Sequence, residues 1–202
     1  MSSTRTAAKQ YWVAIRAMLI FTVVLGIGYT AVITGIGQLV MPWQSNGSTV
    51  KVGNTVVGST LIGQSFTDKK GNALPEWFQS RPSAAGTGYD SSASSGSNYG
   101  PENKDLIAAI TARKAAIAKL DGVAPNSIPA DALTASASGL DSHISPNYAL
   151  EQVARVATVR NLPEAAVKKL VENTIQEPDL GYLGEPRVNV LDLNIALAQL
   201  KG

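Results

Sequence analysis

One uncharged segment near the start of the chain constrains its fold more than any other feature. The run Ala17–Val40 comprises 24 residues without a charged side chain. As an α-helix with a rise of about 1.5 Å per residue it would be roughly 36 Å long, whereas the hydrocarbon core of a bilayer is about 30 Å thick. Trp12 and Trp43 lie on either side, where aromatic rings favour the membrane interface, and Pro42 ends the helix. The sequence therefore predicts one transmembrane helix over about residues 13–41.

The charges around this helix predict its orientation. Basic residues but no acidic ones precede the helix, and the first carboxylate of the chain is Asp68. Positive charges favour the cytoplasmic side, so the N-terminus is expected in the cytoplasm. The absence of cysteine excludes disulfides and thiolate metal sites, as is ordinary for an extracytoplasmic domain of a bacterium. We expect a single-pass protein of the bacterial cell (inner) membrane, with a tail and helix in residues 1–43 and an extracytoplasmic domain in residues 44–202.

A cleaved signal peptide is the alternative to an uncleaved anchor. Its apolar region would be about 7–15 residues long and would precede a cleavage site between small residues. Here the apolar run is longer, and the best small-residue site, Gly35-Ile36-Gly37, lies inside it. The sequence therefore favours an uncleaved anchor.

Small residues recur every four positions within the predicted membrane helix. Residues at this spacing share one face, which lets a second helix approach closely and lets threonine hydroxyls bond across the contact. Glycine and threonine are also simply common in membrane helices, but a lipid-facing anchor would be served equally well by bulky residues. We therefore predict contact with a partner helix through Thr22, Gly26, Thr30 and Thr34, together with Ala31 and Gly35.

The predicted outer domain begins with β-branched segments and continues with helical patterns. Residues 79–103 are rich in Ser, Gly and Ala, yet tyrosines, an arginine and Asn or Asp residues interrupt them, which predicts an ordered loop. Strands early and helices late indicate an α+β fold, with a single small mixed α/β domain after the membrane helix. The predicted strands are 49–52 and 55–62, and the predicted helices are 104–120, 146–160, 163–175 and 188–200.

Few residues suit catalysis or metal binding. The single histidine, His143, follows Asp141 by two positions, but a Ser-His-Asp hydrolase also needs a nucleophile on a strained turn, and no G-x-S-x-G motif occurs. Gly53–Thr60 has the glycine spacing of a phosphate-binding loop but lacks its lysine. We expect no catalytic residue and no metal site. The alternative is a membrane-anchored extracytoplasmic hydrolase that uses His143 and Asp141.

Four motifs in the predicted domain resemble those of a known family. They are Phe78-Gln-Ser-Arg-Pro-Ser83, Ser95-Gly-Ser-Asn98 followed by Gly100-Pro101, Leu133-Thr-Ala-Ser136 with Ser138-Gly-Leu-Asp141 and His143-Ile-Ser-Pro146, and Gly184-Glu-Pro-Arg-Val-Asn189. In this order, and with the N-terminal anchor, they resemble the C subunit of the Kdp high-affinity potassium-transporting P-type ATPase of bacteria over essentially the whole chain. Ser95, Ala137 and Ser142 depart from the Gly, Gly and Pro expected there, which alters loops without changing the resemblance.

The resemblance implies a non-catalytic accessory subunit of an ATP-driven potassium uptake complex. Its partners would be a channel-like potassium-binding subunit, a P-type ATPase subunit and a small single-helix subunit, with membrane lipid and without nucleic acid. The family role is a catalytic chaperone that raises the ATP affinity of the pump subunit, so the complex handles ATP and K⁺ and no tightly bound cofactor is expected. Because the predicted orientation separates the domain from cytosolic ATP, assembly and potassium entry fit better than nucleotide contact. The motif residues expected in functional loops are Gln79, Ser80, Arg81, Pro82, Ser97, Asn98, Ser138, Asp141, His143, Glu185, Arg187 and Asn189.

Overall fold

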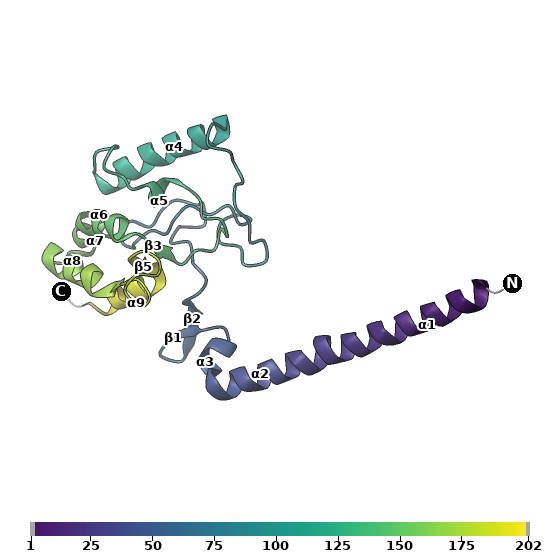
Figure 1. Ribbon diagram of the computed structural model, residues 1–202. Helices are drawn as coiled ribbons and strands as arrows, with labels where there is room; N and C mark the ends of the chain where they lie inside the picture. Colours follow the sequence, from purple (N-terminus) through teal and green to yellow (C-terminus); the bar gives the residue numbers. More distant parts are fainter. Residues whose placement is uncertain (1–2, 201–202) are drawn as a thin grey trace. The chain divides into compact units, whose positions relative to one another are not determined.

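A long helix forms most of the first part of the chain. The structure is a computed structural model that describes residues 3–200, and it divides into two compact units, Met1–Thr49 and Val50–Gly202. In the first unit α1 (Ser3–Phe21), η1 (Thr22–Gly28) and α2 (Tyr29–Val40) follow one another directly, and the short helix α3 (Pro42–Ser45) comes next (Figure 1). The stretch Ala7–Val40 is long and apolar enough to cross a membrane, and a window of 18 residues within it has a mean hydropathy of 2.1. The predicted apolar helix is therefore present in the structure.

The middle of this helix departs from α-helical geometry in a way that the sequence pattern did not predict. Element η1 is a π-helix of 7 residues, a wider turn whose backbone bonds connect residues five positions apart. Thr22 and Gly26 are nevertheless neighbours, because a Cβ added to Gly26 would lie 3.9 Å from Cγ2 of Thr22. This part of the predicted small-residue face is thus present, and all of its residues are exposed in the single chain.

The second unit contains the remaining helices and strands of the described chain, apart from Thr49, the first residue of β1, which belongs to the first unit. The two strands predicted over 49–52 and 55–62 are confirmed and pair with each other, although the second ends at Ser59. The predicted loop 79–103 is ordered without regular secondary structure. The helix predicted from Lys104 is confirmed, with the side chain of Asn103 accepting from the first backbone amides. The elements are β1 (Thr49–Val52), β2 (Thr55–Ser59), α4 (Lys104–Asp121), α5 (Ala130–Leu133), β3 (His143–Ile144), α6 (Pro146–Glu151), α7 (Val153–Arg160), α8 (Glu164–Thr174), β4 (Ile175–Gln176), β5 (Arg187–Asn189) and α9 (Val190–Gln199).

Three strands late in the domain were not predicted from the sequence. Three short strands form an antiparallel sheet of order β3-β5-β4, in which Ile144 and Ile175 both pair with Val188. Strands of two or three residues are too short to leave an alternating pattern in the sequence. Figure 1 shows α6 to α9 gathered around β3 and β5.

The single helix predicted over residues 146–160 was also wrong, because the structure divides it at Gln152 into α6 and α7. The dihedral angles of Gln152 are φ −76° and ψ −10°, which interrupts the helical hydrogen bonding. The side chain of Gln152 is fully buried and bonds to another segment, so a tertiary contact determines this break.

Two buried amide side chains fix the segment Phe78-Gln79 inside the core. Asn194 of α9 accepts from the backbone N–H of Phe78 at 2.9 Å and donates to its carbonyl at 3.0 Å. Gln152 does the same for Gln79, at 2.6 Å and 3.2 Å. We call these four bonds the amide clamp. An extended backbone buried among helices has no strand to pair with, so the amide clamp satisfies peptide groups that would otherwise lose their hydrogen bonds with water.

A buried ion pair supports the same segment. The side chains of Arg155 in α7 and Asp121 at the end of α4 are 4% and 1% exposed, and Nε of Arg155 lies 2.5 Å from Oδ1 of Asp121. Arg155 also donates to the carbonyls of Pro75 and Trp77 and to Oε1 of Gln152. One arginine thus connects α4, α7 and the chain that leads into Phe78.

Replacing Asn194 with leucine tests the amide clamp. Asn194→Leu has a similar volume but leaves the N–H and the carbonyl of Phe78 buried without partners, so we expect a loss of roughly 2–4 kcal/mol in the free energy of unfolding. Gln199→Leu, at an exposed position of the same helix, is the matched control and should change stability by less than about 0.5 kcal/mol. Chemical denaturation of the full chain in an uncharged detergent measures both, and equal stabilities of the two variants would contradict this role.

Candidate functional site

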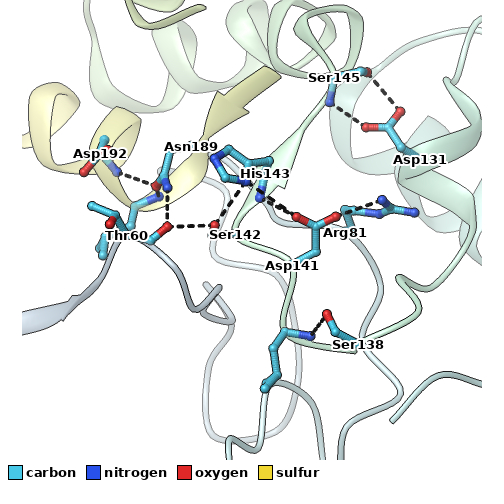
Figure 2. Close-up of polar contacts among 12 residues, drawn as sticks. Thr60, Arg81, Asp131, Ser138, Asp141, Ser142, His143, Ser145, Asn189 and Asp192 are labelled. Carbon is cyan, nitrogen blue, oxygen red and sulfur yellow. Dashed lines mark hydrogen bonds and ion pairs between the residues drawn. The ribbon is translucent and has the colours of Figure 1, made fainter. Parts of the chain in front are cut away.

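The family-like motifs, far apart in sequence, meet in one group of loops and short strands. In the antiparallel pair β3–β5 His143 lies opposite Asn189, which joins the third motif to the fourth. The backbone N–H of Ser95 donates to the carbonyl of Ser138 at 3.0 Å, which joins the second motif to the third. Arg81 of the first motif reaches Asp141 of the third. We call this region the loop cluster (Figure 2).

The charged centre of the loop cluster is Asp141. Its Oδ2 accepts from Nη1 of Arg81 at 3.0 Å, and its Oδ1 accepts from the backbone N–H of His143 at 3.0 Å. The side chains of Arg81 and Asp141 are 23% and 30% exposed, so this ion pair is only partly accessible to water. Burial alone would raise the pKa of Asp141, but the hydrogen bonds of His143 and the charge of Arg81 outweigh it and lower that pKa below its ordinary value.

Tyr89 fastens the long Ser- and Gly-rich loop to this centre. Its hydroxyl donates to the carbonyl of Arg81 at 2.9 Å, and it also lies 3.4 Å from the carbonyl of Asp141. Burial is the main reason that the pKa of Tyr89 is raised to about 12, so the hydroxyl stays protonated and remains a donor. Ser83 adds a bond of 2.6 Å from its hydroxyl to the carbonyl of Gly139. These contacts explain why a sequence of low complexity is ordered.

Two glycines permit the loops to pack closely. A Cβ at Gly63 would lie 2.3 Å from the carbonyl oxygen of Asp141 and 2.5 Å from the ring of Tyr89. Gly139 has φ +66°, and a Cβ there would lie 2.6 Å from the carbonyl oxygen of Ser95. Any side chain at either position would push two loop backbones apart.

A second polar group connects the loop cluster to the C-terminal helix. The carbonyl of Thr60 accepts from the hydroxyl of Ser142 and from Nδ2 of Asn189, both at 2.8 Å. Oδ1 of Asn189 accepts from the first backbone amides of α9, at 3.1 Å for Leu191 and 3.2 Å for Asp192. Asn189 therefore caps α9 and joins it to the end of the β1–β2 hairpin.

The structure brings together some of the predicted motif residues and not others. Ser80, Arg81, Ser138, Asp141, His143 and Asn189 belong to the loop cluster or bond directly to its loops. The side chain of Gln79 is instead bonded to nearby carbonyls, Pro82 contributes a carbonyl to Ser136, and Nη2 of Arg187 lies 3.6 Å from Oδ1 of Asp179. Ser97, Asn98 and Glu185 are exposed. The motifs therefore contain two kinds of residue: some whose bonds hold the loops together, and others that are exposed to solvent.

His143, Asp141 and Ser142 do not form a catalytic triad. In a triad the serine and the carboxylate bond to opposite nitrogens of the imidazole ring. Here Nδ1 of His143 lies 3.2 Å from Oγ of Ser142 and 3.7 Å from Oδ1 of Asp141, so both neighbours lie at the same nitrogen. Ser142 is also only 3% exposed. Among the described residues no group of three or more His, Asp or Glu side chains could bind a metal ion.

Some important residues were missed by reasoning from the sequence. Asp131 accepts from the backbone N–H of Ser145 at 2.7 Å and from its hydroxyl at 2.9 Å, which positions the residue that caps α6. The pair of Arg155 and Asp121 was also missed. Nothing local marks Arg155, since it lies on the side of the helix opposite the apolar positions Leu150, Val153 and Ala157. Nothing local marks the partners of Asp131 or Tyr89 either.

The fold and this site define a class of protein: a membrane-anchored α+β domain whose polar motif residues shape loops. The chain belongs to the KdpC family, because the model of that family, described as the c chain of a K⁺-transporting ATPase, matches residues 11–199.

Relatives agree with this assignment over nearly full length. A potassium-transporting ATPase KdpC subunit of Caulobacter vibrioides is 52% identical over 186 residues, which cover 91% of this chain and 90% of the relative. The subunit of the same name from Kineococcus radiotolerans is 50% identical over 180 residues, covering 89% and 88% of the two chains. That of Streptomyces avermitilis is 42% identical over 216 residues, covering 98% and 97%. The chain is therefore a KdpC-type subunit of a potassium-transporting ATPase, and nothing supports the alternative of a hydrolase.

Asparagine at position 141 should change how stability depends on pH. Because the pKa of Asp141 is lower in the folded state, its stabilising contribution is complete above the unfolded value of about 3.9 and is lost as the pH falls through the folded value. Asp141→Asn should therefore be less stable than the parent chain at pH 7 and should lose less stability between pH 5 and pH 2. Denaturation midpoints of the full chain at pH 7, 5, 3 and 2 measure this. Glu185→Gln, at an exposed carboxylate, is the control and should follow the parent curve.

Proposed function

We propose that this chain is a non-catalytic subunit that assembles and stabilises the potassium-transporting ATPase complex, with its membrane helix as one of the contact surfaces. The observation that carries this proposal is the exposed face of small residues on a helix long enough to span the bilayer. Between helices in lipid, where apolar burial gives no advantage, close approach along small residues is a main source of attraction.

The helix itself gives no other reason for these small residues. A Cβ added to Gly26 would meet only Cγ2 of Thr22, at the ordinary contact distance of 3.9 Å, and a Cβ added to Gly35 would meet nothing within 4 Å. Neither glycine is needed for packing within the described chain. A partner helix packed against this face would explain why small residues occur there. The other membrane-embedded subunits of the complex are the candidate partners.

The domain is proposed to act from the extracytoplasmic side. Arg5, Lys9 and Arg16 before the helix favour a cytoplasmic N-terminus in the cell (inner) membrane. The domain would then contact the subunit through which potassium enters, and its loop cluster offers a surface whose side chains are already fixed by mutual bonds. The proposed partners are a channel-like potassium-binding subunit, the P-type ATPase subunit and a small single-helix subunit.

The help given to the ATPase subunit is proposed to be indirect. In this orientation ATP, bound by the ATPase subunit in the cytoplasm, and this domain lie on opposite sides of the membrane. A rise in the ATP affinity of the pump would then follow from stabilising one conformation of the complex, since a subunit that binds that conformation better shifts the population toward it. ATP and K⁺ would be bound by the other subunits.

A glycine substitution tests the helix contact. Gly26→Leu should reduce co-purification of this chain with the other subunits by about tenfold, because the leucine separates two closely packed helices. Gly28→Leu is the matched control in the same helix, where a Cβ would lie 3.5 Å from the carbonyl of Val23, again an ordinary contact. Quantitative mass spectrometry of the tagged complex from native membranes gives the ratios. Equal recovery of partners by Gly26→Leu and the parent chain would refute the contact.

The proposed orientation can be tested with single cysteines, because the sequence has none of its own. Ser97→Cys, in an exposed loop of the domain, should react in intact spheroplasts with a maleimide that does not cross membranes. Ala8→Cys, exposed before the apolar run, should react only after the membrane is permeabilised. The reverse pattern would show that the domain lies in the cytoplasm.

A further inference from the structure

A pocket of about 750 Å³ lies between the C-terminal half of α4 and the loops beneath it. Helix α4 contacts α5 and α7, and the side chain of Asp121 at its end is buried, but its other residues are only partly buried or exposed. One wall is formed by Arg113, Ala116, Ile117, Lys119 and Leu120 of α4. The remaining lining comes from the loops at 65–73 and 79–89 and from two residues below them, Ala132 and Tyr148.

The charged groups in this lining all have one sign. Arg81, Arg113 and Lys119 line the pocket, and no aspartate or glutamate does. Nη1 of Arg113 donates to the carbonyl of Leu133 at 2.8 Å, which fixes that guanidinium without neutralising it. Arg81 is paired with Asp141, but its Nε is buried and has no hydrogen-bond partner within residues 3–200. The lining therefore favours an anion.

The neighbouring carboxylates do not cancel this preference. Asp121, Asp131 and Glu151 act electrostatically on Tyr148 without lining the pocket. Asp121 is paired with an arginine and Asp131 is bonded to a serine. Burial, together with the charges of Asp121 and Asp131, raises the pKa of Glu151, and its side chain is not part of the pocket lining. Tyr148 is 3% exposed, and burial raises its pKa, so its hydroxyl remains a donor.

The rest of the lining is apolar or carries neutral donors. Phe66, Pro82, Ile117 and Leu120 supply apolar surface, and serine and threonine hydroxyls lie among them. A pocket with clustered cations beside apolar walls suits a ligand with a charged head and a hydrocarbon portion, since each part then finds a matching surface. A free inorganic ion would leave the apolar walls unused.

We propose that the pocket beneath α4 binds an amphiphile with an anionic phosphate head group, the chemistry of an acidic phospholipid. Arg113 and Lys119 bind the phosphate, and the apolar side chains contact the first carbons of the chains. Only residues 41–49 connect the apolar helix to this domain, so membrane lipids are the amphiphiles most available to it. This site is separate from the proposed helix contact and can fail or succeed independently of it.

Calorimetric titration of the full chain in an uncharged maltoside detergent tests the site. The ligand is dihexanoyl phosphatidic acid, compared with zwitterionic dihexanoyl phosphatidylcholine and with inorganic phosphate. The acidic lipid should bind at least about tenfold more tightly than either, because only it matches both surfaces, and its affinity should fall as salt is raised.

Two matched pairs of variants on α4 locate the binding. Lys119→Gln should weaken binding of the acidic lipid about three- to fivefold, whereas Lys114→Gln, on the same helix but outside the pocket, should not. Ala116→Glu places a carboxylate in the lining and should weaken binding about tenfold. Ala115→Glu adds the same charge at an adjacent exposed position outside it and should have little effect.

Each alternative result has a clear meaning. No binding of the acidic lipid, equal binding of the zwitterionic lipid, or equal binding of inorganic phosphate would each overturn the proposal. Binding that Lys119→Gln and Ala116→Glu leave unchanged would place the lipid elsewhere, for example along the apolar helix, and would also overturn it. Glutamate is compatible with a helix at an exposed position, so circular dichroism should show both alanine variants folded.

Discussion

The domain that follows the apolar helix depends on the amide clamp, in which Asn194 and Gln152 satisfy the buried backbone of Phe78 and Gln79. Phe78 is completely buried, so burying its ring also removes its peptide groups from water. Two side-chain amides replace the strand that would normally pair with this segment. The amide clamp thereby fixes the direction in which the chain leaves the core after Gln79. The loop that carries Arg81 therefore begins from a rigidly held segment.

The contacts of the loop cluster depend on this rigidly held segment. Arg81 reaches Asp141, Tyr89 binds the backbone of both loops, and Asn189 connects β5 to the hairpin and caps α9. Each polar side chain satisfies a backbone group or a charge of another segment. Side chains of the types that often act in catalysis, such as Arg81 and Asp141, here hold the loops in place. This agrees with membership of a family of transport-complex subunits. An ordered surface of this kind suits recognition by a partner, because no flexible loop has to be ordered on binding.

Much of the local structure could be predicted, and the exceptions have physical causes. Structure that depends on residues close in sequence could be predicted from local patterns. This applies to the apolar helix, the β1–β2 hairpin and the caps of α4 and α6. The sheet β3-β5-β4 was missed because its strands have only two or three residues and because β3 pairs with β5 across more than forty residues of sequence. The division of the helix at Gln152 was missed because its cause is a bond to Gln79, not a local breaker. The order of the loop 79–103 was foreseen from its interrupting tyrosines and polar residues, but its partners were not.

The sequence by itself determined the membrane-spanning length, the four-residue recurrence of small residues, most helix boundaries and the family, because each of these is a property of neighbouring residues or of motifs in order. Only the tertiary structure decided that the motifs meet in the loop cluster, that Ser142 and Asp141 lie at the same nitrogen of His143 and cannot form a triad with it, and that α4 leaves a cationic pocket beneath it. These features depend on distances between segments far apart in the chain, and such distances are set by how the core packs and by which buried polar groups must find partners.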